Sequence, residues 1–294
     1  MTPKVAIIVL SWNGKDDTFE CLKSLGEVVY PNFWTILVDN GSTDGTAEAV
    51  RSAFSDVEVI ETGQNLGFAG GNNIGIRRSL DSGADAVLLL NNDTVVAPEF
   101  LSPLVKVLYR SDDIAAVNPL IYYYDQPDVI WSAGGEIDRR TGIAYQRYLD
   151  IKDVGQFRGE TAVDYGVGAA LLICREAIEK VGLLDPDYFL YYEESDWCFR
   201  ARDAGYKTIF TPESKIWHKV SRGFEGRSAA QLYYFCRNRL YFLKKRRVKS
   251  SRLLRIVLSD FSRMAASMAV HGDVRSSRAV LRGVADFYLG RMGK

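Results

Sequence analysis

The chain has 294 residues, long enough for one large domain or two moderate ones. Its composition, with 47% hydrophobic and 25% charged residues and only 8 prolines, excludes an intrinsically disordered or fibrous protein. The formal net charge of zero averages two unlike parts. Residues 1–218 carry 19 basic and 33 acidic side chains, whereas residues 219–294 carry 18 basic and 4 acidic ones. An acidic body is therefore followed by a basic tail.

The first 120 residues alternate short apolar runs with amphipathic stretches. Strands are expected at 5–10, 35–38, 57–61, 86–90 and 115–118, and helices at 17–25, 46–54, 72–82 and 98–109. This alternation predicts an α/β fold with a mainly parallel sheet and helices on both faces. Ligands of such sheets bind beyond the carboxyl ends of the strands. Polar clusters at 11–14, 39–45 and 91–93 fall at those ends.

The remainder of the chain is predicted in two parts. Residues 121–222 are less regular, with a buried strand at 167–174, a helix at 175–181 and an acidic, aromatic stretch at 188–205. Residues 223–294 are expected to be a basic, amphipathic helical extension, because apolar residues recur there at helical spacing.

The cysteines and the N-terminal residues help to predict the cellular compartment of the protein. The four cysteines are scattered, with no CxxC pair, so neither a zinc site nor a disulfide framework is predicted, and a reducing compartment fits best. Residues 1–4 lack the layout of a signal peptide. Apolar runs such as 5–10 and 86–90 are far shorter than the roughly 20 residues that span a bilayer. We expect a cytoplasmic protein that contacts the inner face of the membrane only peripherally.

Short motifs at the predicted strand ends and beyond them follow one order. They lie at 5–14, 38–44, 65–73, 90–93, 182–185, 192–200, 204–206 and 217–218. In this order they resemble the family 2 glycosyltransferases, inverting enzymes of the GT-A fold that use nucleotide-sugar donors. The resemblance covers about residues 4–220, and the tail looks like that of rhamnosyltransferase-like members. It implies a nucleotide-sugar-binding half at 1–120 and an acceptor-binding, catalytic half at 121–222.

Asp39 is the candidate for recognition of the nucleotide base. A carboxylate at the end of the second strand can accept a hydrogen bond from N3–H of uracil or thymine, whereas cytosine presents an acceptor there. The resemblance implies the same role, and the alternative is an Asx turn or helix cap. The other residues expected to contact the nucleotide sugar are Ser11, Asn13, Asn65, Gly67, Asn72, Asn91, Asn92 and Asp93.

Asn91-Asn92-Asp93 stands where the family has its metal-binding DxD motif, with Asn91 in place of the first aspartate. Asp93 is the expected ligand of a divalent cation, Mg²⁺ or Mn²⁺, since hard cations prefer oxygen ligands. Asn91 is expected to contact ribose or a metal-bound water. The resemblance implies His218 as a second ligand, and an imidazole ligand suits Mn²⁺ as well as Mg²⁺.

Glu193, Glu194 and Asp196 form the densest acidic cluster. Displacement at an anomeric carbon needs a base for the incoming hydroxyl, and like-charged neighbours raise a carboxylate's pKa toward neutrality. The family's base is the second acid of its Glu-Asp pair, which falls on Glu194. Glu193 and Asp196 are then supporting acids, with Asp196 pairing with Arg200. For Glu193, the alternative is a solvated, acid-rich helix start.

The tail interleaves basic with aromatic residues. They are Arg237, Arg239, Lys244, Lys245, Arg246, Arg247 and Lys249 with Tyr233, Tyr234, Phe235, Tyr241 and Phe242. Such helices are typical of proteins that bind an anionic membrane surface. Docking on the acidic body and a homodimer contact are the alternatives. No nucleic-acid motif is present, and no nucleic-acid partner is expected.

These features together predict an inverting, metal-dependent glycosyltransferase. Its donor would be a UDP- or dTDP-sugar, with dTDP-rhamnose implied by the resemblance, and its acceptor a saccharide or lipid-linked saccharide of cell-surface polysaccharide synthesis. A sugar-nucleotide pyrophosphorylase is a rival, although the loop at 11–14 has no basic residue to hold a triphosphate. A non-catalytic saccharide- or membrane-binding scaffold is another, although it leaves Asp39, Asp93 and Glu194 unexplained.

Overall fold

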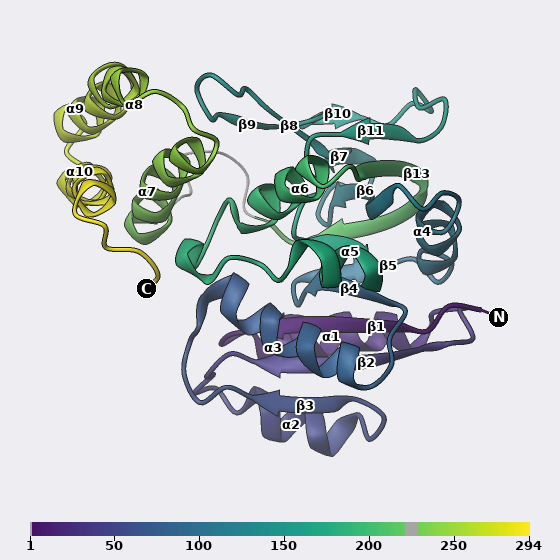
Figure 1. The fold of residues 1–294 in the computed structure, drawn as a ribbon. Coiled ribbons are helices and arrows are strands. Elements are labelled where there is room, and N and C mark those ends of the chain that lie inside the picture. Colours follow the sequence, from purple (N-terminus) through teal and green to yellow (C-terminus); the bar gives the residue numbers. More distant parts are fainter. Residues whose placement is uncertain (1, 221–227) are drawn as a thin grey trace.

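The protein is described from a computed structural model that covers residues 2–220 and 228–294 (Figure 1). Its N-terminal part contains a parallel sheet of four strands in the order β3-β2-β1-β4. The strands are β1 (Val5–Ser11), β2 (Phe33–Asp39), β3 (Glu58–Glu61) and β4 (Ala86–Asn91). Residues 5–9 of β1 are completely buried, as an apolar strand covered on both faces must be. The predicted α/β fold is confirmed for this part of the chain.

Four helices connect or follow these strands. They are α1 (Lys15–Gly26), α2 (Thr46–Ala53), α3 (Gly67–Asp81) and α4 (Leu101–Leu108). Helix α3 begins five residues before the predicted start at 72, so the glycine-rich segment forms its first turns and not a loop. A Cβ at Gly71 would lie 2.4 Å from Leu10, and one at Gly75 would lie 2.6 Å from Ile8. The glycines therefore let α3 pack closely on β1.

The sheet continues beyond β4 with mixed strand directions. Strand β12 (Ala170–Cys174) is antiparallel to both β4 and β6 (Ile114–Tyr123). Strand β6 is wholly buried and parallel to β13 (Lys207–His218). The remaining strands are β5 (Thr94–Val96), β7 (Val129–Ser132), β10 (Ile151–Lys152) and β11 (Thr161–Val163), and β8 (Gly135–Ile137) pairs with β9 (Ala144–Gln146) in a separate hairpin. Because β12 lies between β4 and β6, the turn at 166–169, which precedes β12, lies beside the end of β4.

The helices of the second half and of the tail lie beside each other in Figure 1. Those of the second half are α5 (Arg175–Val181), the 3₁₀ turn η1 (Pro186–Tyr188) and α6 (Glu193–Asp203). Those of the tail are α7 (Ala229–Lys245), α8 (Ser250–Ile256), the π-helical η3 (Val257–Phe261), α9 (Ser262–Val270) and α10 (Val274–Tyr288). The tail helices share a core of their own around Cys236, Leu240 and Phe261.

Helix α7 docks on the body through its polar side chains. Arg237 and Asn238 are fully buried, and both donate hydrogen bonds to the carbonyl oxygen of Tyr188, over 3.0 and 2.7 Å. Arg239 donates to the carbonyl of Thr141 over 2.7 Å. The expectation that the basic residues of α7 face a membrane is therefore wrong for Arg237 and Arg239. For these residues the alternative, docking on the body, is correct.

The described residues contain neither a membrane-spanning helix nor a disulfide. Within residues 2–220 and 228–294 no helix is long and apolar enough to cross a membrane. The four cysteines are buried and none is joined in a disulfide, as predicted.

Candidate active site

The carboxyl ends of three parallel strands bring the predicted nucleotide-binding residues to one edge. In the strand register Ser11 lies opposite Asp39, and Leu10 lies opposite Asn91. Strands β1, β2 and β4 therefore end at the same level. The loops that follow them form one continuous rim, which is where parallel α/β sheets bind ligands.

Asp39 has two oxygens with different surroundings. Its side chain is 2% exposed, and Oδ1 accepts a hydrogen bond from the backbone N–H of Ser42 over 2.8 Å. Oδ2 is buried and has no hydrogen-bond partner in the described part of the chain. A buried carboxylate oxygen without a donor is unfavourable, so it is explained if a ligand supplies one. The Asx turn uses Oδ1, which leaves Oδ2 available for the predicted contact with a nucleotide base.

Ser11 and Asn92 hold the start of α1. Ser11 Oγ lies 2.8 Å from Thr18 Oγ1, and Asn92 Nδ2 donates to Thr18 Oγ1 over 3.0 Å and to the Gly14 carbonyl over 3.2 Å. These side-chain groups are engaged within the protein. Their effect on a ligand would pass through the shape of the loop between β1 and α1.

The side chains of Asn13 and Asn65 are also engaged by backbone N–H groups of the loops near the rim. Asn13 Oδ1 accepts from the backbone N–H of Thr43 over 2.8 Å, which connects the loops after β1 and β2. Asn65 Oδ1 accepts from the N–H of Gly67 over 2.8 Å, at the start of α3, where Gly67 has φ +75°. Asn40, which the sequence analysis did not single out, is buried and donates to the Gly67 carbonyl over 3.0 Å.

Asn72 lies in the second turn of α3 and is almost completely buried. Its Nδ2 donates to the Phe68 carbonyl over 3.0 Å, whereas Oδ1 has no partner among the described residues. An amide with one unused acceptor at this position is suited to a ligand hydroxyl.

Asp93 and His218 meet at the end of β4. Because β5 pairs with the end of β13, His218 lies opposite Thr94, and its Nε2 is 2.9 Å from Asp93 Oδ1. Asn91 Nδ2 is 3.4 Å from the same nitrogen. The imidazole is 4% exposed and packs edge-on against Trp131 at 4.5 Å. The two predicted ligands, 125 residues apart in sequence, are therefore adjacent.

The donor set at this pair fits a divalent cation. A carboxylate oxygen and an imidazole nitrogen facing each other are ligands that Mn²⁺ and Mg²⁺ accept. No cluster of three or more His, Cys, Asp or Glu residues suited to a metal occurs in the described ranges. Asp93 and His218 would thus supply two ligands of such a cation, and the others would come from a bound molecule or water.

The acidic cluster starts helix α6 and follows an unusual backbone. Phe189, Tyr191 and Tyr192 all have positive φ, at +62°, +71° and +75°, a region that non-glycine residues rarely occupy. Asn238 of α7 donates to the carbonyls of Leu190 and Tyr191 over 2.7 and 3.0 Å. The tail therefore fixes the segment that leads into the acids, a role that the sequence pattern of α7 gave no sign of.

Burial raises the pKa values of both Glu193 and Glu194. It raises the pKa of Glu194 to about 7, although hydrogen bonds from backbone groups, including that of Gly168, act in the opposite direction. Burial and the neighbouring Glu194 charge raise the pKa of Glu193 well above its ordinary value. Oε2 of each glutamate has no hydrogen-bond partner among the described residues. The pKa of each carboxyl is therefore raised, and the pair together is suited to releasing and accepting a proton near neutral pH.

A turn connects Glu194 to the end of β4. A Cβ on Gly168 would lie 3.8 Å from Glu194 Cδ and 2.9 Å from the ring of Phe68. The carbonyl oxygen of the next residue, Ala169, accepts a hydrogen bond from the backbone N–H of Asn91 over 3.0 Å. The carboxyl of Glu194 and the end of β4 are thus separated by two residues of backbone, with no side chain at Gly168 between them.

Asp196 supports the site from inside the protein. Its side chain is completely buried, and Arg200 Nε lies 2.9 Å from Oδ2, which is the predicted pair. Lys245 of the tail lies 2.7 Å from the same oxygen, and the Tyr188 hydroxyl donates to Oδ1 over 3.2 Å. Asp196 therefore anchors α6 and does not face a ligand.

The family model for "Glycosyl transferase family 2" matches residues 6–182. The chain belongs to this family. As a family 2 member, it has the motifs at 5–14, 38–44 and 90–93 at the rim described above, and its sheet and helices correspond to the GT-A fold.

Relatives differ in how much of their length the chain covers. It is 28% identical over 203 residues to the low-salt glycan biosynthesis hexosyltransferase Agl10 of Haloferax volcanii, covering 69% of this chain but only 62% of that protein. It is 24% identical to the dTDP-rhamnosyl transferase RfbF of Shigella flexneri, covering 84% and 82%. It is 25% identical to the N-acetylglucosaminyl-diphospho-decaprenol L-rhamnosyltransferase of Mycobacterium tuberculosis, covering 95% and 96%.

A solved structure has a similar fold over the whole chain. The mannosyltransferase PcManGT of Pyrobaculum calidifontis, in complex with GDP-mannose and Mn²⁺, superposes with a TM-score of 0.64. The sequences are 17% identical, and the match covers 99% of this chain and 88% of that one. The likeness establishes the fold.

Proposed function

We propose that this family 2 protein is an inverting, divalent-metal-dependent glycosyltransferase. The observation that carries the proposal is the position of Glu194, a carboxyl with a pKa of about 7. Two backbone residues, Gly168 and Ala169, separate it from Asn91 at the end of β4, the strand end beyond which Asp93 meets His218. A base and a cation-binding pair at one rim are what transfer of a sugar from a nucleoside diphosphate to a hydroxyl requires.

Each residue then has a defined part in the reaction. Asp39 Oδ2 accepts the imide N–H of the base, which favours uracil or thymine over cytosine. A cation held by Asp93 and His218 would neutralise charge on the departing diphosphate. Glu194 takes the proton of the acceptor hydroxyl as the oxygen attacks the anomeric carbon from the face opposite the leaving group, and the configuration at that carbon inverts.

Two of the relatives support a finer assignment. Both RfbF and the mycobacterial protein are named as rhamnosyl transferases, and the second name specifies an acceptor sugar linked through diphosphate to decaprenol. We infer that dTDP-rhamnose is the donor and that a lipid-linked saccharide of cell-surface polysaccharide synthesis is the acceptor.

A donor-hydrolysis and transfer screen tests this function. Wild-type protein with Mn²⁺ is offered dTDP-rhamnose, UDP-glucose and GDP-mannose, and release of nucleotide is measured. Glu194→Gln should lower turnover by about 10²–10⁴-fold while the donor still binds. Asp203→Asn, on the exposed end of the same helix, is the matched control and should retain activity. Near-normal turnover of Glu194→Gln would contradict the role of the base, and absence of nucleotide binding would favour a scaffold.

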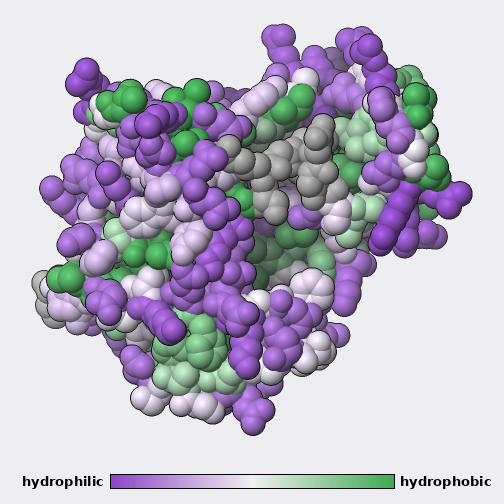
Figure 2. Space-filling model, turned by 180° about the vertical axis from the view of Figure 1, so that it is seen from behind, coloured by the Kyte–Doolittle hydropathy of each residue, from purple (hydrophilic) through white to green (hydrophobic). Residues whose placement is uncertain are grey.

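We also propose that the tail contacts an anionic membrane surface, through α8–α10 and not through α7. Large apolar side chains are exposed there among arginines, including Leu254, Leu258, Val270 and Leu289. Figure 2 shows such hydrophobic patches between hydrophilic ones at the upper right. Salt-sensitive co-sedimentation with phosphatidylglycerol vesicles that Leu258→Glu weakens would support the contact, and equal sedimentation of both proteins would oppose it.

A further inference from the structure

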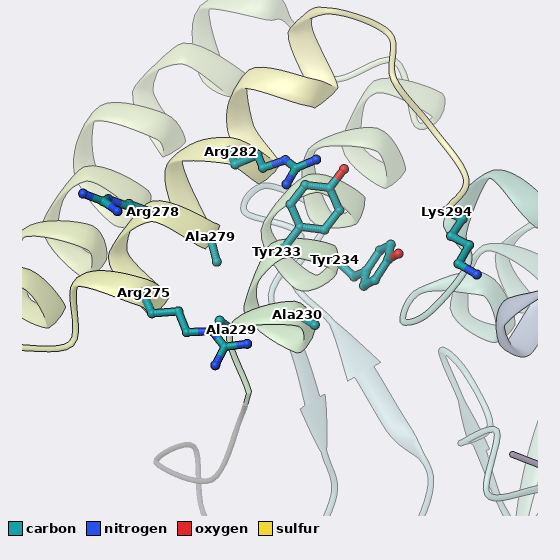
Figure 3. Close-up of a pocket in the computed structure, with 9 residues that line it drawn as sticks. All are labelled: Ala229, Ala230, Tyr233, Tyr234, Arg275, Arg278, Ala279, Arg282 and Lys294. Atoms are coloured by element: carbon teal, nitrogen blue, oxygen red, sulfur yellow. The ribbon is translucent and has the colours of Figure 1, made fainter. Parts of the chain in front are cut away.

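A cavity of about 390 Å³ opens between helices α7 and α10 of the tail, away from the rim of the sheet (Figure 3). Its polar lining consists of Tyr233 and Tyr234 from α7, Arg275, Arg278 and Arg282 from α10, and Lys294, and alanines form the rest. No carboxylate side chain is among the residues that line it. The cavity is therefore cationic and aromatic.

The arginines of this wall lie on one face of α10, because positions three and four apart are neighbours on a helix. Arg282 is compensated by Asp286, whose carboxylate lies 3.5 Å away and also accepts the Tyr233 hydroxyl over 2.9 Å. Arg275 and Arg278 form no salt bridge within the described part of the chain, and both are exposed. Like charges so spaced repel each other, and a bound anion would relieve the repulsion.

A fully buried cation lies behind the tyrosines. The guanidinium carbon of Arg237 is 5.3 Å from the centroid of the Tyr233 ring and 5.0 Å from that of Tyr234. Arg237 is held by the backbone carbonyls of Asp187 and Tyr188. The two rings thus form a fixed wall with positive charge on both sides, and in Figure 3 the Arg282 side chain points toward Tyr233.

The same wall borders the catalytic region. The ring of Tyr234 stacks on Phe189 with the centroids 4.9 Å apart. The Phe189 carbonyl accepts the backbone N–H of Phe68 over 2.6 Å, and the Phe68 ring reaches Gly168 beside Glu194. A continuous series of contacts through Phe189 and Phe68 therefore connects the wall of the cavity to the surroundings of the base.

We propose that this cavity binds the phosphate or diphosphate ester of the acceptor. Guanidinium groups bind phosphate oxygens through paired, charge-assisted hydrogen bonds, which makes arginine the suitable residue for such a group. The assignment to an acceptor rests on the proposed function, whereas the binding of a phosphorylated ligand does not. The ester would belong either to a lipid-linked saccharide or to a soluble sugar phosphate.

Binding of simple phosphates tests the site without any glycosyl transfer. Calorimetry is done on the full chain in EDTA, which removes metal-dependent binding at Asp93, with pyrophosphate, farnesyl diphosphate and farnesol as probes. Arg275→Glu/Arg278→Glu should weaken binding of pyrophosphate by about tenfold or more. Arg252→Glu/Arg255→Glu, two exposed arginines of α8 outside the cavity, is the control of equal charge change and should bind as the wild type does. Thermal unfolding of all variants checks that they are folded.

Three outcomes are decisive for the site. Selective loss in the Arg275/Arg278 variant supports it, whereas equal loss in both variants, or no loss in either, overturns it. If the site holds, tighter binding of farnesyl diphosphate than of pyrophosphate assigns the ester to a lipid, and equal binding assigns it to a soluble phosphate. In the transfer assay, the variant should raise KM for a phosphate-bearing acceptor only. Failure of the wild type to hydrolyse any donor would overturn the proposed function and leave this binding result standing.

Discussion

Lys245 at the end of the tail helix α7 lies 2.7 Å from Asp196, a completely buried carboxylate of helix α6. Its ammonium group also lies 2.8 Å from Asp185, just before the 3₁₀ turn η1. One cation of the tail therefore holds both ends of the segment that carries Phe189 and the acids. The tail is a structural part of the site.

Lys245→Met should destabilise the protein and lower turnover together. Asp196 would keep Arg200 and Tyr188 but lose one charge partner, and an under-compensated buried carboxylate costs about 1–3 kcal/mol. Lys244→Met, at the neighbouring exposed position, is the control and should leave the free energy of unfolding almost unchanged. Urea denaturation of both variants measures the difference. Equal stability of the two would show that the ion pair contributes nothing.

Asp39→Asn should change the preference among nucleotide bases. Asparagine can keep an oxygen for the N–H of Ser42 and would place an N–H donor where Oδ2 now stands, which matches the N3 acceptor of cytosine. We expect binding of dTDP and UDP to weaken by about tenfold or more and the preference to move toward CDP. Calorimetry with the three diphosphates in Mn²⁺ tests this, with the exposed Asp56→Asn as control. An unchanged order of affinities would remove Asp39 from base recognition.

The pH profile of transfer should report Glu194. Because burial raises the pKa of this carboxyl to about 7, the base is protonated and inactive below that pH. We expect kcat/KM to fall about tenfold per pH unit below 7 and to level off above it. A flat profile between pH 5.5 and 7 would contradict the assignment. In Glu194→Gln the remaining activity should lose this dependence.

Glu193→Gln should stabilise the protein at alkaline pH. The pKa of Glu193 is raised well above 4.5 in the folded protein, so the folded state retains a proton that the unfolded state releases, and stability falls as pH rises above about 4.5. Glutamine is neutral throughout and avoids this loss. The gain in unfolding free energy at pH 8 should exceed about 1.4 kcal/mol, the equivalent of one pKa unit. Urea denaturation at pH 4.5 and pH 8 measures it. A gain of equal size at both pH values would point to packing in place of proton linkage.

Metal dependence should follow Asp93 and His218. EDTA should abolish transfer, and Mn²⁺ should restore it. Asp93→Asn and His218→Ala should each raise the Mn²⁺ concentration needed for half-maximal activity by about tenfold or more, equivalent to about 1.4 kcal/mol of binding. His271→Ala removes the other, exposed histidine and serves as the control. Full activity in EDTA would exclude both residues from a metal site.

Local patterns predicted a large part of the fold. The helix at 175–181 and the ends of β1, β2 and β4 follow from apolar runs followed by polar clusters, which are properties of contiguous residues. The start of α3 was placed five residues too late. Glycines at the first turns of α3 weaken the helical signal, and what offsets this is close packing on β1, a tertiary contact.

The charge distribution of the chain likewise separates features that contiguous residues predict from contacts that only folding creates. The sequence predicts without any tertiary information that a basic tail follows an acidic body, that Asp39 ends a parallel strand and that Asp93 closely follows another, because these features are read along the chain. Folding brings His218 to Asp93 across 125 residues, and it brings Arg237 to Tyr188 and Lys245 to Asp196 across 49 residues each. The physical reason is that an arginine or lysine on an amphipathic helix is equally suited to lipid phosphate and to a carboxylate or carbonyl. The surface that folding brings opposite to it selects between them.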